Sequence, residues 1–151
     1  MITKESVIKD FNFFKTEKEI PKKSKDTFVV RLPVNIETKL ELLQSLYKIL
    51  QFPDYFGFNW DALIDCLGDF HWLKAKNLVL VHEDIPFKNK ELKELLVYLD
   101  ILNITIEDWK EYNQKDFYED WELKNMHTFS VYFSDKCKTQ LEVFSKKLPI
   151  G

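Results

Sequence analysis

Three short runs of apolar residues have the length and composition of β-strands. Residues 27–32 (TFVVRL) are rich in β-branched side chains and end at Pro33. Residues 77–82 (NLVLVH) are continuously apolar, which is typical of a strand that is covered on both faces. In residues 126–134, Phe129, Val131 and Phe133 alternate with Ser130 and Tyr132, which predicts a third strand.

Between these runs, apolar residues recur at the three- and four-residue intervals of amphipathic helices. The clearest stripes cover residues 37–50 and 89–102. A shorter helix is predicted from about Trp60 to Leu67, where Asn59 is a good N-cap and Gly68 a stop signal. It follows a turn in which Gly57 provides conformational freedom. Further short helices are predicted at residues 104–112 and 135–147.

The order of these elements predicts the fold class. Strands that alternate with helices favour an α/β fold with a mostly parallel, three-stranded sheet and helices packed on at least one face. We expect one domain over residues 1–151, with residues 1–26 as an N-terminal extension and 135–151 as a C-terminal helical segment. Within the extension, a short amphipathic helix is predicted from the helical spacing of Val7, Ile8, Phe11 and Phe14.

Composition narrows the class of protein. Hydrophobic residues make up 45% of the chain and the formal net charge is −3, so neither disorder nor a nucleic-acid partner is expected. The longest apolar runs are too short to span a membrane, and the N-terminus lacks a signal-peptide core. The two cysteines, Cys66 and Cys137, do not suggest a disulfide framework. We therefore expect a reduced, cytoplasmic protein, and the composition leaves its oligomeric state open.

Charge is unevenly distributed, because residues 107–122 (EDWKEYNQKDFYEDWE) hold seven acids and two lysines. This acidic, aromatic stretch has the character of an insert, which we place at residues 107–126. Two interpretations follow. Its aromatic side chains either pack onto the domain as an ordinary loop, or they form a second binding surface beside the first.

The most informative stretch is residues 52–73, FPDYFGFNWDALIDCLGDFHWL. Asp61 and Asp65 lie four residues apart on the predicted helix, about 40° from each other around its axis. Like charges at this spacing weaken a helix by about 0.2–0.5 kcal/mol, which favours a role in binding a cationic partner. A helical projection places Trp60, Ile64 and two leucines on the packing side. The aromatic residues around the acids are Tyr55, Phe56, Phe58, Trp60 and Phe70.

An enzymatic interpretation uses the same acids. Asp61 and Asp65 have the spacing to act as general acid and base, or to hold a cation together with His71. The chain has no HExxH, GxSxG or P-loop motif, and His71, His82 and His127 lack metal-ligand spacing. We therefore expect a non-enzyme that needs no cofactor or metal. A small metal-dependent hydrolase that uses the two aspartates is the alternative.

The run PDYFGFNWDALIDCL resembles the signature of the barstar family, the intracellular inhibitors of barnase-type ribonucleases. The resemblance implies a barstar-like fold and an acidic helix that enters the active site of a cationic ribonuclease, where basic side chains otherwise hold RNA phosphates. It implies that Asp61 and Asp65 are the key acids. The whole implied partner-binding set is Tyr55, Asn59, Trp60, Asp61, Ile64, Asp65, Gly68, Asp69 and Phe70.

The chain also departs from the family pattern. Ile64 stands where the best-known member has a tryptophan, and Gly68 and Asp69 occur in shifted order. The glutamate that the family contributes from a later helix is matched by either Glu94 or Asp100. The resemblance places Trp60 and Ile64 at the binding rim, whereas the helical projection places both on the packing side. The expected partner is a cationic ribonuclease or a related toxin domain, and a barstar-like immunity or interaction module for another protein is the alternative.

Overall fold

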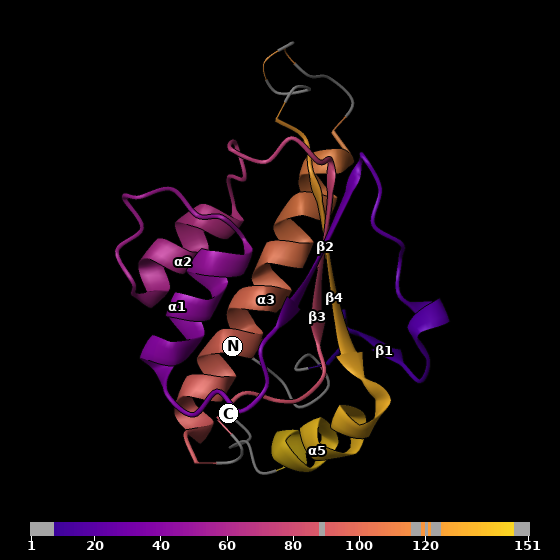
Figure 1. Ribbon diagram of the computed structural model, residues 1–151, viewed down its shortest axis with the longest axis vertical. Helices are drawn as coiled ribbons and strands as arrows, with labels where there is room; N and C mark the ends of the chain where they lie inside the picture. The colour runs from indigo at the N-terminus through magenta and orange to yellow at the C-terminus, as the bar shows by residue number, and fades with distance from the viewer. Residues whose placement is uncertain (1–7, 88–89, 116–118, 120, 122–124, 147–151) are drawn as a thin grey trace.

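The structure is a computed structural model that describes residues 8–87, 90–115, 119, 121 and 125–146. Within these ranges the secondary structure begins with a short strand and a 3-10 turn and then alternates between strands and helices (Figure 1). In chain order the elements are β1 (Asn12–Phe14), η1 (Glu17–Glu19), β2 (Thr27–Leu32), α1 (Lys39–Ile49), α2 (Trp60–Leu67), β3 (Asn77–His82), α3 (Leu92–Asn113), β4 (Thr128–Ser134) and α5 (Asp135–Lys146).

The strands form one parallel sheet in the order β1-β4-β3-β2. Figure 1 shows α1, α2 and α3 on one face of this sheet, while the N-terminal segment that carries η1 runs along the other face. The predicted parallel α/β architecture is therefore confirmed. The described residues give the sheet four strands, however, rather than the three that the sequence predicted.

The additional strand is β1, in a segment for which a helix was predicted. Asn12, Phe13 and Phe14 pair with the last residues of β4. Phe11 packs against Phe133 on the helix-covered face, whereas Phe14 is buried on the opposite face. A helix would place Phe11 and Phe14 on the same side. The helical spacing was therefore misleading, since this segment buries its aromatic rings on both faces of the sheet; Val7 lies outside the described residues.

Both faces of β3 are buried, as its apolar sequence predicted. Leu78 and Leu80 point into the main core beneath the helices, and Val79 and Val81 point to the other face. There the N-terminal segment covers them with a smaller apolar cluster that includes Ile20. The residues before β2 therefore complete the second layer that a fully buried parallel strand requires.

Helix α3 is continuous from Leu92 to Asn113, although the sequence predicted two separate helices. No glycine or proline interrupts it, and its buried residues continue at helical intervals through Leu102 and Ile106 to Trp109. Residues 107–113, the first part of the acidic segment, are therefore the last turns of a core helix. In the part of the chain that the structure describes, no helix is long and apolar enough to cross a membrane.

A buried polar pair lies between the sheet and α3. His82 is fully buried, with Nε2 2.7 Å from the hydroxyl of Tyr98 and Nδ1 3.2 Å from the carbonyl oxygen of Tyr132. Its ring also stacks on Phe133, with 4.1 Å between the ring centroids. Burial lowers the pKa of His82 from 6.5 to about 3, so the imidazole is neutral in the folded protein at physiological pH.

This buried histidine predicts that stability falls as the pH is lowered. Below pH 6.5 the unfolded chain takes up a proton at His82, whereas the folded chain does not until about pH 3. The free energy of unfolding should therefore drop by up to about 1.4 kcal/mol per pH unit in this window. Partial burial of His127 lowers its pKa and acts in the same direction. Urea unfolding between pH 7 and pH 4.5 measures the slope, and a His82 ring resonance that titrates near pH 6.5 in the folded protein would contradict it.

Candidate functional site

The turn before α2 fixes where this helix begins. Asn59 Oδ1 accepts a hydrogen bond from the amide of Ala62 at 2.8 Å, and Asn59 Nδ2 donates to the carbonyl oxygen of Gly57 at 3.2 Å. A Cβ atom on residue 57 would lie 3.3 Å from that Nδ2. The residue with left-handed backbone is Phe58, at φ 52°. Gly57 therefore leaves space for the cap and does not supply the unusual backbone angle that the sequence suggested.

Helix α2 buries a slightly different stripe from the one that the helical projection predicted. Leu63, Cys66 and Leu67 are buried, and Trp60 is half-buried. Ile64 is 42% exposed, so the projection placed it wrongly on the packing side. The buried positions follow the interval of three and then four residues, which leaves Ile64 on the outer surface.

The outer surface of α2 carries two carboxylates. Asp61 and Asp65 are both exposed and occupy equivalent positions one turn apart. Among the described residues, neither side chain has a hydrogen bond or an ion pair. Between Lys48 and Lys74 the sequence contains four aspartates and no lysine or arginine, so no cation in this stretch offsets the charge. The result is a concentrated negative surface.

Exposed apolar side chains lie next to these acids. Tyr55 is 68% exposed and Phe58 is 39% exposed, and both precede α2 in the chain. The ring of Phe58 is held by Tyr47 and Phe56, with centroids 5.1 Å and 4.9 Å away. We use the name acidic face for the surface made by Tyr55, Phe58, Asp61, Ile64 and Asp65.

Trp60 connects the acidic face to α3. Its Nε1 atom donates a hydrogen bond to Glu94 Oε2 at 2.9 Å, and Lys39 Nζ lies 5.2 Å from the centroid of its ring. This contact places the carboxylate of Glu94 beside the first turn of α2. Asp100 lies six residues further along α3, about 120° around the helix from Glu94. Of the two acids that the sequence left open, Glu94 is therefore the one next to α2.

The residues after α2 leave its axis. Gly68 is the C-cap and is exposed, as the sequence predicted. Asp69 Oδ2 lies 2.8 Å from Nδ1 of the exposed His71, so this third aspartate has a partner that Asp61 and Asp65 lack. The backbone carbonyl of Asp69 accepts a hydrogen bond from Asn125 Nδ2 at 3.3 Å, which places the end of the acidic segment beside the end of α2.

Phe70 does not lie on the surface, and here the implied binding set must be corrected. Its side chain has no exposed area and stacks on Trp109 with 5.9 Å between the centroids. Its backbone has φ 54°, which turns the chain inward directly after the helix. Trp109 in turn donates from Nε1 to the carbonyl oxygen of Leu67 at 2.9 Å. Phe70 therefore joins α2 to α3 from inside the core.

The remaining chemically reactive groups do not meet at this site. In the described ranges, no group of three or more histidine, cysteine or acidic side chains could hold a metal ion. Cys66 and Cys137 are both free and buried, as expected of small hydrophobic side chains. Burial raises the pKa of both thiols to about 11, so they are poor nucleophiles at neutral pH.

The fold and the acidic face together describe a parallel α/β protein that displays an acidic helix with aromatic neighbours. The sequence model of the family described as Barstar (barnase inhibitor) matches residues 27–120, which is more than half of the chain. The chain therefore belongs to the barstar family. The match begins at the first residue of β2 and includes the whole of α2 and α3. No curated protein and no solved structure matches the chain.

Proposed function

We propose that this protein is an intracellular inhibitor that blocks the active site of a cationic ribonuclease toxin. The observation that carries the proposal is the exposure of Asp61 and Asp65 on one side of α2, without a partner among the described residues. A ribonuclease holds RNA through basic side chains that contact phosphates. Two carboxylates at adjacent turns of a rigid helix present negative charge to such a site in place of RNA.

The apolar part of the acidic face has a separate role in the proposed complex. Tyr55, Phe58 and Ile64 provide contact area with few side-chain torsions to immobilise, which is how aromatic residues contribute at interface centres. The carboxylates then select a basic partner and orient it. Asn59 supports both parts, because its cap fixes the first turn of α2 on which Asp61 lies.

Glu94 extends the negative charge of the proposed site onto α3. Its hydrogen bond with Trp60 holds the carboxylate in one position before a partner arrives, so less side-chain entropy is lost on binding. The ammonium of Lys39 lies over the same indole ring and partly offsets this charge. We therefore assign the main electrostatic contribution to Asp61 and Asp65 and a smaller one to Glu94.

We expect stoichiometric inhibition that weakens with salt. The measurement is RNA cleavage by barnase and by other basic nuclease domains of its class, titrated with this protein. At least one enzyme should lose its activity at an equimolar end point. The association rate should fall steeply above about 0.1 M salt, where charges more than about 10 Å apart are screened.

The outcome distinguishes the proposal from its alternative. If no nuclease of the panel is inhibited, while a basic protein without nuclease activity binds with the same salt dependence, the chain is an interaction module for a different partner. Ile64 and the shifted order of Gly68 and Asp69 are features that separate this site from the family pattern, and both would then reflect the different target.

A further inference from the structure

The outer edge of β2 is available for pairing with another strand. β2 is the last strand of the sheet, next to β3 only. The carbonyl oxygen of Asp26 accepts from the amide of Asn77, so residues 28, 30 and 32 direct their backbone groups toward β3. Residues 27, 29 and 31 therefore direct theirs outward. Thr27 exchanges backbone hydrogen bonds with Ser24, but within the described residues the outward backbone groups of Val29 and Arg31 have no hydrogen-bond partner.

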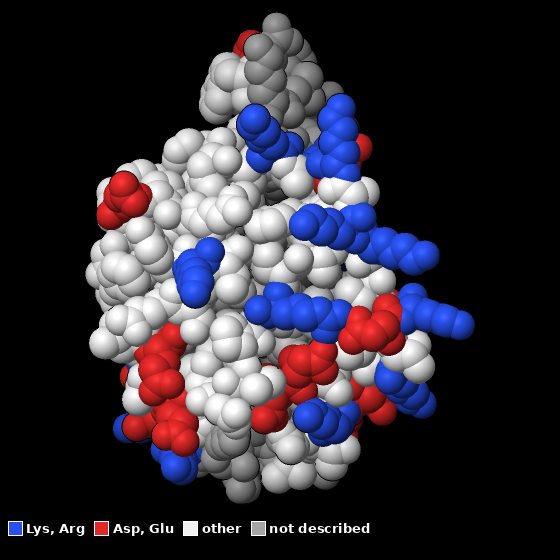
Figure 2. Space-filling model, viewed as in Figure 1, with Lys and Arg blue, Asp and Glu red and all other residues white. Residues whose placement is uncertain are grey.

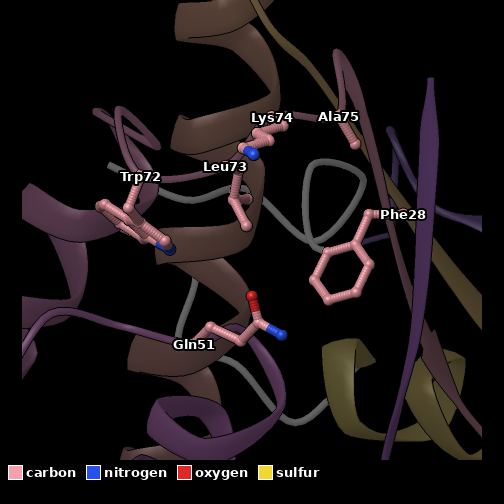
Figure 3. A pocket seen from close by; sticks show the side chains of 6 residues that line it. All are labelled: Phe28, Gln51, Trp72, Leu73, Lys74 and Ala75. Atoms are coloured by element: carbon pink, nitrogen blue, oxygen red, sulfur yellow. The ribbon is translucent and has the colours of Figure 1, made fainter. Parts of the chain in front are cut away.

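A pocket adjoins this open edge on the helix-covered side. It has a volume of about 290 Å³ and is lined by residues from β2, from the end of α1 and from the loop after α2. Figure 3 shows the rings of Phe28 and Trp72 on opposite sides, with the amide of Gln51 pointing between them. Trp72 is fixed, because its Nε1 donates to the carbonyl oxygen of Leu50 at 3.0 Å. The pocket therefore has a rigid aromatic wall.

Several lysines surround the edge and the pocket, although the exposed Asp26 directly precedes β2 and Arg31 is paired with Glu17 and Glu83. Lys74 lines the pocket, and Lys25 lies two residues before the start of β2. Both lysines are exposed, and neither has an ion-pair partner among the described residues. Lys22 and Lys23 precede Lys25 in the same N-terminal segment and are also exposed. Figure 2 shows several lysine and arginine side chains on this face of the molecule, with acidic side chains among them. The charge of these lysines is opposite in sign to that of the acidic face.

We propose that the β2 edge binds an extended, acidic segment of a protein partner, which adds to the sheet as a further strand. The backbone groups of Val29 and Arg31 provide the hydrogen bonds, and every second side chain of the segment points toward the helix-covered side. A large apolar side chain of the segment enters the pocket between Phe28 and Trp72. Its carboxylates lie near Lys25 and Lys74. This second site does not depend on the proposed function of the acidic face.

The test uses short synthetic peptides with the full-length protein. The first probe has one central Phe with Val on either side and Glu at both ends, and its control carries Lys in place of every Glu. The acidic peptide should bind at least about tenfold more tightly than the basic one. In amide hydrogen exchange the peptide should protect Val29 and Arg31, whose amides should exchange rapidly in the free protein because they lack a hydrogen-bond partner among the described residues. Two further probes carry N-methyl groups on odd or on even residues, and they should differ in affinity by at least about tenfold, because only one set faces β2.

Matched variants of the protein separate this site from the acidic face. Lys74→Glu should weaken the acidic peptide at least about fivefold and leave the fold unchanged, since Lys74 is exposed. Val29→Pro removes an outward N–H and should abolish strand addition, whereas Asp61→Asn should have no effect on it. The proposal is overturned if the acidic peptide does not bind, or if the two methylated probes bind equally. Protection of Val29 and Arg31 in the free protein would also overturn it, and sedimentation would then show whether a second copy covers the edge.

Discussion

Reversal of both exposed charges on α2, by Asp61→Lys together with Asp65→Lys, should abolish inhibition of the target ribonuclease. The proposed complex buries these carboxylates against basic side chains of the enzyme. The loss of one partner from a buried charge pair costs about 3–5 kcal/mol, because the other charge remains buried without compensation. Replacement by lysine adds repulsion to this cost. We therefore expect affinity to fall by at least about a thousandfold, since each 1.4 kcal/mol corresponds to a factor of ten.

The control for this experiment is a variant with the same change in net charge elsewhere. Glu107 and Glu142 are exposed residues on α3 and α5, outside the acidic face. Glu107→Lys together with Glu142→Lys should retain inhibition within about threefold, apart from a modest change in association rate. Far-UV circular dichroism checks the fold of both double variants. Equal inhibition by the α2 variant and the wild type would show that the acidic face is not the inhibitory surface.

Local signals in the sequence were sufficient to predict α2. Asn59 and Gly68 mark its two ends, and the structure begins the helix at Trp60 and ends it at Leu67, as the sequence predicted. Cap residues act on neighbouring backbone groups, so they can be interpreted without tertiary information. The prediction of β3 was also local, because its continuous apolar run indicated a strand that is buried on both faces.

Features that depend on distant partners could not be predicted in this way. β1 is a strand because residues about 120 positions later form β4 beside it, and no local pattern in residues 8–14 contains that information. The contact between Trp60 and Glu94 crosses from α2 to α3, so the sequence could not choose Glu94 over Asp100. The helical projection wrongly placed Ile64 on the packing side for a similar reason. The helical projection gave the right period, but the direction of the buried side is set by the elements that pack against α2.

The burial of Phe70 also depends on distant partners and could not be predicted from the local sequence. The resemblance to the barstar family placed Phe70 among the partner-binding residues, whereas the structure buries its ring completely against α3 and β4. Phe70→Ala should therefore lower the free energy of unfolding by about 3–5 kcal/mol, as expected when a buried aromatic ring leaves a cavity. Phe70→Gly should cost less than Phe70→Ala, because glycine relieves the left-handed backbone at φ 54°.

Tyr55→Ala provides the matched control, because Tyr55 is 68% exposed and lies on the acidic face. The free energy of unfolding of this variant should change by less than about 0.5 kcal/mol, as for most surface substitutions, while the variant's affinity for the ribonuclease falls. Phe70→Ala should show the opposite result: lower stability in urea unfolding, but near-normal association at temperatures where it remains folded. If Phe70→Ala instead loses affinity without losing stability, its ring contacts the partner directly and the buried position is wrong. The pair of variants thus separates the residues that bind the partner from those that hold α2 in place.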